Sequence, residues 1–236
     1  ENKWLGSKTG QGFYKKEGKD ILTLDLDTLE YRANKKASFA TLELTKTIEK
    51  PIDRFKVLVT GKDKAGDFYR KNFASMFQYC SNRIPEITDA FYKIDDAMKA
   101  GFGWENGPFE IWDAIGVEKG IELMKAEGYQ PASWVTDMLA SGNTSFYSIK
   151  DGATHFYSIT NKKVEKIPGQ DAFIILNNIR ESKKIWNNSD SIITDLGDGI
   201  INLEFTSKMN SIGAGVLQGI NKAIDMAEKG YEGLVI

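Results

Sequence analysis

The stretch of sequence that decides the fold is Ile94-Asp95-Asp96-Ala97-Met98-Lys99-Ala100-Gly101-Phe102-Gly103-Trp104-Glu105-Asn106-Gly107-Pro108-Phe109-Glu110-Ile111-Trp112-Asp113-Ala114-Ile115-Gly116. It predicts a helix that runs to Ala100, a tight loop, and a second helix that begins at Pro108, since proline is favoured in the first helical turn. The loop glycines Gly101, Gly103 and Gly107 can take left-handed backbone angles. Apolar residues recur every three or four positions on both sides of the loop: Ile87, Phe91, Ile94 and Met98 before it, and Phe109, Trp112 and Ile115 after it. Each helix therefore has one face to bury.

The composition is that of a globular chain without an extended charged surface. It has 236 residues, 41% of them apolar, and a net charge of −2. This excludes general nucleic-acid binding, although a local pocket for a CoA phosphate stays open. Cys80 is the single cysteine, which excludes an internal disulfide and indicates a reducing cytoplasm. No apolar run approaches the roughly 20 residues of a membrane span.

The segments around the deciding stretch predict further helices. Asp67 can cap a helix through Cys80, and Pro85 can open the next one. Glycines separate two further helical pieces before residue 142. Residues 66–142 are therefore expected to form a small helical domain. Before it, residues 15–65 are expected to be a helical connector that includes one short extended piece around residues 21–31.

The remaining segments predict strands and one long helix. The repeated Phe-Tyr-Ser-Ile runs at 146–149 and 156–159 flank an Asp-Gly turn, which indicates a hairpin in the segment 143–189. Residues 190–236 predict a second hairpin around Gly197-Asp198-Gly199, then a helix through Glu228 and a strand at 233–236. The expected buried stripe of that helix is Ile212, Val216, Ile220, Ala223, Ile224 and Ala227.

Three motifs resemble parts of fatty-acid β-oxidation enzymes. The run Asp-Ala-Met-Lys-x-Gly-x-Gly, followed by Gly-Pro-Phe-Glu and Asp-x-x-Gly, resembles the helical C-terminal domain of L-3-hydroxyacyl-CoA dehydrogenases. Either Asp95 or Asp96 matches the acidic residue of that signature. Leu5-Gly6-x-Lys8-x-Gly10-x-Gly12-Phe13-Tyr14 is similar to the closing motif of a preceding domain of this kind. Residues 190–236 resemble the opening of the enoyl-CoA hydratase (crotonase) fold.

The resemblance implies a piece of a longer, bifunctional enzyme. The expected domains are 1–14 (the tail of a first helical dehydrogenase domain), 15–65 (connector), 66–142 (second helical domain), 143–189 (hairpin and linker) and 190–236 (start of the crotonase domain). The expected fold class is mainly α, followed by hairpins and a crotonase-like α/β unit. The parent would oxidise L-3-hydroxyacyl-CoA with NAD and hydrate trans-2-enoyl-CoA. This segment is expected to bind no cofactor and to be inactive alone.

The candidate functional residues are few. His155 is the lone histidine and has no motif-placed nucleophile or carboxylate, so no catalytic residue and no metal site are predicted. By the crotonase resemblance, Lys208 and Met209 would lie near the CoA nucleotide, with a solvated lysine as the simpler interpretation. The loop residues Gly101, Phe102, Gly103, Trp104, Gly107 and Pro108 are expected to shape a packing surface or interface.

The resemblance also implies partners. The chain would pack on the Rossmann domain and the first helical domain of the parent, wall the acyl-CoA cleft, bind no nucleic acid and span no membrane. A homodimer formed through the apolar stripe of residues 212–227 stays open. The alternative function is a non-catalytic module that holds an acyl-CoA or a protein through Phe102, Trp104 and the aromatic hairpin.

Overall fold

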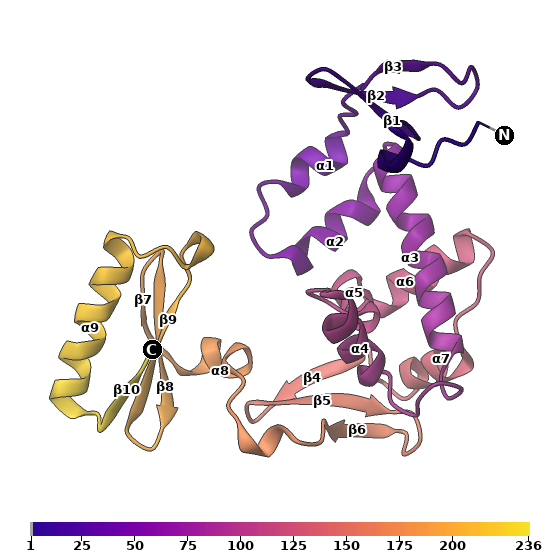
Figure 1. Ribbon diagram of the computed structural model, residues 1–236. Helices are drawn as coiled ribbons and strands as arrows, with labels where there is room; N and C mark the ends of the chain where they lie inside the picture. Colours follow the sequence, from indigo (N-terminus) through magenta and orange to yellow (C-terminus); the bar gives the residue numbers. More distant parts are fainter. Residues whose placement is uncertain (1) are drawn as a thin grey trace.

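A computed structural model describes residues 2–236 of the chain. These residues form nine α-helices and ten β-strands, and the strands belong to three small sheets. Figure 1 shows a helical body in the middle, a small sheet at its N-terminal end, a second sheet below it and a separate C-terminal βα unit. The architecture is mixed α/β, so the prediction of a mainly α chain is too narrow. The added strands come from charged or polar segments in which strand alternation is weak.

The N-terminal sheet is an antiparallel meander. After a 3-10 turn at Ser7–Thr9, strands β1 (Tyr14–Glu17), β2 (Asp20–Leu24) and β3 (Tyr31–Ala33) pair in the order β1-β2-β3. The segment expected to be a helical connector therefore begins with a sheet. Its helical part follows as α1 (Ala40–Thr45) and α2 (Pro51–Thr60), and Pro51 is the first residue of α2.

Five helices build the body: α3 (Lys64–Asn82), α4 (Tyr92–Phe102), α5 (Pro108–Ile115), α6 (Val117–Ala126) and α7 (Ser133–Ala140). Two predicted helix starts are wrong. The cap of α3 is Asp63, whose carboxylate accepts the Gly66 N–H, whereas Asp67 lies inside the helix. Pro85 lies in a turn, and the next helix begins only at Tyr92.

The loop between α4 and α5 uses its glycines in different ways. Gly103 ends α4 with φ 66°, a left-handed angle, whereas Gly101 is helical. Gly107 has φ −80°, so the expected left-handed angle is wrong there. Its missing side chain is needed for another reason: a Cβ at Gly107 would collide with the Cα and Cβ of Asp95. α4 and the start of α5 therefore meet backbone to backbone.

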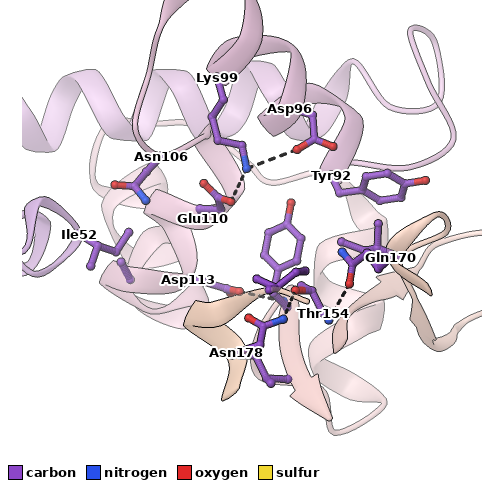
Figure 2. Close-up of a pocket in the computed structure, with 15 residues that line it drawn as sticks. Ile52, Tyr92, Asp96, Lys99, Asn106, Glu110, Asp113, Thr154, Gln170 and Asn178 are labelled. Atoms are coloured by element: carbon purple, nitrogen blue, oxygen red, sulfur yellow. Dashed lines mark hydrogen bonds and ion pairs between the residues drawn. The ribbon is translucent and has the colours of Figure 1, made fainter. Parts of the chain in front are cut away.

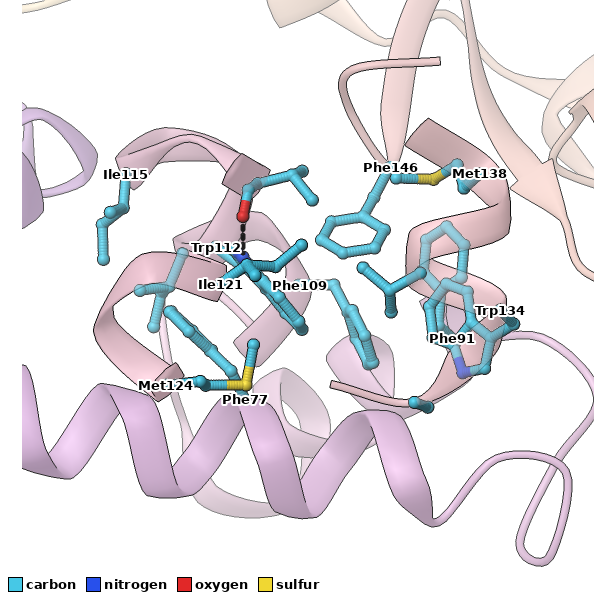
Figure 3. Packing of buried hydrophobic residues seen from close by; sticks show 14 of the residues in the cluster. Phe77, Phe91, Phe109, Trp112, Ile115, Ile121, Met124, Trp134, Met138 and Phe146 are labelled. Atoms are coloured by element: carbon cyan, nitrogen blue, oxygen red, sulfur yellow. Dashed lines mark hydrogen bonds between the residues drawn. The ribbon is translucent and has the colours of Figure 1, made fainter. Parts of the chain in front are cut away.

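The core of the body is a layer of aromatic rings (Figure 3). Phe77 stacks on Trp112 with ring centroids 4.7 Å apart, and Phe91 contacts Phe109 at 5.1 Å. Phe146, which precedes the first hairpin, packs edge-on against Trp112 at 5.0 Å. Offset and edge-on ring pairs add to the stabilisation from burial. The hairpin sheet is thus anchored in the helical core.

That sheet has three antiparallel strands, β4 (Tyr147–Lys150), β5 (Ala153–Ser158) and β6 (Lys163–Lys166). The predicted hairpin is confirmed, and both Asp151 and Gly152 have positive φ, as a type I′ turn requires. Tyr147 pairs with Phe156 and Ser148 pairs with His155, so only the first two residues of each Phe-Tyr-Ser-Ile run lie opposite the other run. β6 was not predicted, because its sequence Lys-Val-Glu-Lys is mostly charged.

The C-terminal unit follows a 3-10 turn at Gln170–Ala172 and helix α8 (Leu176–Lys183). Its strands β7 (Lys184–Asn187), β8 (Ser191–Gly197), β9 (Ile200–Phe205) and β10 (Gly233–Val235) pair in the order β10-β9-β8-β7, with a 3-10 turn at Lys208–Asn210 and helix α9 (Ala214–Gly230) between β9 and β10. β10 runs parallel to β9, and the other pairs are antiparallel. The predicted hairpin, helix and final strand are confirmed.

The buried stripe of α9 is narrower than predicted. Val216 and Ala223 are fully buried, whereas Ile212 and Ile224 are 67% and 43% exposed. Val216 and Ala223 are seven positions apart and lie on one side of the helix, which faces β8 and β9. Ile224 directly follows Ala223 and therefore turns away from the sheet.

Within residues 2–236, no helix has both the length and the apolar character that crossing a bilayer demands.

Two glycines of the α4–α5 loop give a matched stability test. Gly107→Ala is expected to destabilise the fold by at least about 2 kcal/mol, because the added Cβ collides with the α4 backbone. Gly101→Ala has open space around its Cβ in a helical position and should be neutral or stabilising by about 0.5–1 kcal/mol. Urea unfolding of the two variants measures the difference. Equal stabilities would contradict the close approach of the two helices.

Candidate functional site

The centre of the candidate site is the carboxylate of Asp95, which is fully buried. Its Oδ1 accepts the Phe109 N–H at 2.9 Å, and its Oδ2 accepts the Glu110 N–H at 3.0 Å and the Tyr147 hydroxyl at 2.8 Å. The two amides belong to the first turn of α5, where helix N–H groups have no partner within the helix. Asp95 therefore caps α5 from the neighbouring helix, since Gly107 has no side chain to do so. Of the two residues that could match the signature, Asp95 has this role.

Asp113 lies on α5, one helix turn after Phe109 and Glu110, and it binds the start of β4 to the same network. Its Oδ1 accepts the Phe146 N–H at 2.7 Å, and its Oδ2 accepts the Tyr147 N–H at 2.9 Å. Tyr147 is therefore held twice, by its backbone on Asp113 and by its hydroxyl on Asp95. These contacts join α4, α5 and β4 into one unit.

Burial changes the acidity of this network. It raises the pKa of Asp95 to about 7, and the hydrogen bonds from the Phe109 N–H and the Tyr147 hydroxyl oppose that rise only in part. Burial likewise raises the pKa of Asp113 to about 7 against the two N–H bonds it accepts. Burial, with Asp95 beside it, raises the pKa of Tyr147 far above its ordinary value.

A cleft of about 520 Å³ opens beside this network (Figure 2). On its α4 side, Lys99 Nζ lies 2.7 Å from Glu110 Oε1 and 3.4 Å from Asp96 Oδ1. Glu110 Oε2 also accepts the Gly107 N–H at 2.8 Å, which closes the start of α5. The charged groups at the cleft are therefore paired with one another or with the backbone.

The chemistry available at the cleft is limited. Two buried carboxyls with raised pKa values beside a tyrosine are the kind of cluster that marks catalytic sites. Here three donors already occupy Asp95, and two occupy Asp113. Across residues 2–236, no group of three or more histidine, cysteine and acidic side chains is placed to hold a metal ion. The arrangement therefore supports a structural role for Asp95 and Asp113, which hold α4, α5 and β4 together, rather than a role in acid–base catalysis.

A second cavity, of about 650 Å³, lies between α3 and α4 and is mostly apolar. Its lining includes Met76, Cys80, Ile94 and Met98, with Trp104 at the end of α4. Burial raises the pKa of the Cys80 thiol to about 11, which keeps the thiol protonated and unreactive at neutral pH. We call this cavity the α3–α4 groove.

The structure separates the six predicted loop residues. Phe102 is 76% exposed and Trp104 is 37% exposed, next to the left-handed Gly103. Gly107 and Pro108 are instead buried against α4, and Gly101 lies in the last turn of α4 with open space around it. Only the first half of the loop is therefore available as a surface.

The other predicted residues lie outside both cavities. Lys208 and Met209 form the 3-10 turn after β9, where Met209 is 90% exposed and has φ 59°. His155 lies in β5, and its Nδ1 is 3.2 Å from the Ala153 carbonyl oxygen. Sequence reasoning missed the roles of Asp113 and Tyr147. The Asp-x-x-Gly of the signature and the first aromatic run contained both, but neither pattern shows that they meet.

The pH dependence of stability tests the buried carboxyls. Between the unfolded pKa of about 4 and the native value of about 7, the native state holds protons that the unfolded state has lost. The free energy of unfolding is therefore expected to fall as the pH rises from 4 to 7. Asp95→Asn should make this slope shallower, by at most about 1.4 kcal/mol per pH unit. Denaturant unfolding at several pH values measures it.

Asp96 provides the control for this experiment. It is the adjacent residue of α4 but is exposed at the rim of the cleft, so Asp96→Asn should leave the slope unchanged. A slope that is the same in the wild type and in Asp95→Asn would contradict titration of the buried carboxyl.

Comparisons with known proteins place the whole chain beside fatty-acid enzymes. The chain is 40% identical, over all its length, to a protein of Bacillus subtilis (strain 168) named as a 3-hydroxyacyl-CoA dehydrogenase. It is 22% and 23% identical to proteins of Rickettsia felis and Rickettsia prowazekii named as fatty acid oxidation complex trifunctional enzymes. No model of a protein family and no solved structure matches the chain. The chain spans 30% of the Bacillus relative and 29% of each Rickettsia relative, so it is similar to less than a third of each.

Proposed function

We propose that this chain is a structural, cleft-completing segment of a fatty-acid β-oxidation enzyme. The complete enzyme would oxidise L-3-hydroxyacyl-CoA with NAD and hydrate trans-2-enoyl-CoA. The observation that carries the proposal is the Asp95 network, because it gives structural roles to the acidic residue, the Gly-Pro-Phe-Glu run and Asp113 of the dehydrogenase signature. The 40% identity to the Bacillus dehydrogenase along the whole chain supports it. A non-catalytic binding module is not favoured, since all three relatives carry the names of enzymes.

The start of α9 does not fit an NAD site. The parallel pair β9 and β10 with α9 between them is the element order that could hold a dinucleotide at the start of a helix. However, a Cβ at Gly215 would collide with the carboxylate of Asp190, and one at Gly219 would collide with Ser191. Gly215 and Gly219 let α9 pack closely on the sheet. The carboxylate of Asp190 lies at the start of α9, where a pyrophosphate would need a hydrogen-bond donor. We therefore assign NAD binding and hydride transfer to another part of the parent.

The α3–α4 groove is the proposed docking face for the preceding helical domain and the Rossmann domain. Its lining is apolar, and exposed Phe102 and half-buried Trp104 stand beside it. Large aromatic residues at the edge of an apolar groove are typical anchors of protein interfaces. This packing would place α4 and α5 as one wall of the acyl-CoA cleft in the parent.

The C-terminal unit is proposed as the start of the hydratase domain. This assignment is supported by the order of its elements, which is a hairpin, a helix and a strand parallel to β9. The single cysteine supports a cytoplasmic location.

A complementation assay tests the proposed function. The chain alone should not reduce acetoacetyl-CoA with NADH. The Bacillus relative with its matching segment removed should bind the chain and gain dehydrogenase activity from it. Trp104→Ala should weaken this binding about tenfold or more, because Trp104 lines the proposed docking face and is 37% exposed in the free chain. Titration followed by NADH absorbance measures both effects.

Phe68 provides the matched control for Trp104. It is an aromatic residue of α3, 60% exposed and outside the groove, so Phe68→Ala should bind like the wild type. Dehydrogenase activity of the chain alone would overturn the assignment of NAD binding and hydride transfer to another part of the parent. Equal binding by the two variants would instead overturn the docking face.

The CoA contact at Lys208 has its own test in the full-length parent. Lys208 is exposed at the start of the turn that precedes α9. Lys208→Ala should weaken acyl-CoA binding by about 0.5–1 kcal/mol if the ammonium meets a phosphate, and the exposed Lys222→Ala on α9 should not. Unchanged affinity in calorimetric titration would leave Lys208 as a solvated lysine.

A further inference from the structure

Helix α8 lies between the hairpin sheet and the C-terminal sheet (Figure 1). Its sequence, Leu-Asn-Asn-Ile-Arg-Glu-Ser-Lys, contains three residues that are poor helix formers, and no side chain caps its start. Helices of eight residues do not persist in water by themselves. The contacts of α8 with the sheets on its two sides must therefore supply its stability.

The first set of contacts joins α8 to the hairpin. Asn178 Nδ2 donates to the Gly152 carbonyl oxygen at 3.2 Å and to Thr154 Oγ1 at 2.9 Å. The next residue, Ile179, packs closely on the turn, since a Cβ at Gly152 would lie 3.0 Å from its Cγ2. Gly152 also has a positive φ, so both the backbone angle and the nearby Ile179 side chain favour glycine at this position. One side of α8 is thus fitted to the end of the hairpin.

The second set of contacts joins α8 to the C-terminal sheet. Arg180 Nε donates to Glu204 Oε2 at 2.9 Å, and Arg180 Nη2 donates to Glu204 Oε1. Both side chains are about three-quarters buried, with exposures of 24% and 23%. Leu203 packs near Gly219 of α9, so the adjacent Glu204 points to the opposite face of the sheet. A two-bond arginine–carboxylate pair in such a site fixes orientation as well as distance.

We propose that α8 is an ionic coupler that fixes the orientation of the C-terminal unit relative to the helical body. Asn178 and Arg180 are two positions apart, and side chains at this spacing do not share a helix face. The same short helix therefore holds the hairpin with one side and β9 with the other. Without the Arg180–Glu204 pair, α8 keeps its packing against β7 and β8 but loses the charged bond that fixes it to β9, so its hold on the C-terminal unit weakens. This role does not depend on the reaction that the chain serves.

A charge exchange tests the coupler in the complete 236-residue chain. Arg180→Glu places two carboxylates together and should speed amide hydrogen exchange in residues 175–183 about tenfold. The radius of gyration from small-angle scattering should rise, because the C-terminal unit is held less tightly against the helical body. The double variant Arg180→Glu/Glu204→Arg recreates the pair with reversed charges and should return exchange to within about twofold of the wild type.

Lys184→Glu is the matched control. Lys184 carries the same charge at the end of α8, but its partner Glu181 is 81% exposed and three positions away, so the pair spans no interface. This variant should exchange like the wild type. If Arg180→Glu also loses protection in β8 and β9, Arg180→Gln removes the charge without repulsion and carries the test. Wild-type exchange after loss of the Arg180 charge, or no recovery in the double variant, would overturn the coupler.

Discussion

The fold depends on one carboxylate that does the work of a missing helix cap. α5 begins with Gly107 and Pro108, and glycine offers no side-chain oxygen to the free amides of the first turn. Asp95 supplies that oxygen from α4, and it can reach because Gly107 lets the two backbones touch. The missing side chain of Gly107 and the buried carboxylate of Asp95 therefore act together to cap α5.

The capping of α5 by Asp95 also positions the aromatic core. With α5 fixed against α4, Phe109 and Trp112 point into the space between α3, α6 and the hairpin. Asp113, on the next turn, then draws the start of β4 down to the helix, which places Phe146 between the rings. A polar network and an apolar layer thus meet along α5, and each fixes the geometry of the other.

The parts of this fold that sequence reasoning found are those where one local signal dominates. Pro108 sets a helix start, Asp151-Gly152 sets a hairpin turn, and the apolar stripe of α9 sets its buried side. The missed parts need information from distant residues. The choice of Asp63 over Asp67 as the cap of α3 was missed because both acids precede the same apolar run, and the bonds from Thr41, 22 positions away, that also hold the Asp63 carboxylate are not visible in the local sequence. The Tyr147 hydroxyl bond to Asp95 spans 52 positions, and neither local pattern contains it.

The outer strand β10 of the C-terminal sheet differs from the other outer strands. The outer strands β1, β3, β4, β6 and β7 each carry a lysine or arginine, whereas β10 is Gly-Leu-Val. Charged side chains on an outer strand oppose the addition of further strands, because the new neighbour would have to cover them. Of the sheet edges in residues 2–236, the free edge of β10 is the one without such protection. Growth of a sheet by backbone pairing is therefore least opposed at β10, and the C-terminal sheet can extend from this side.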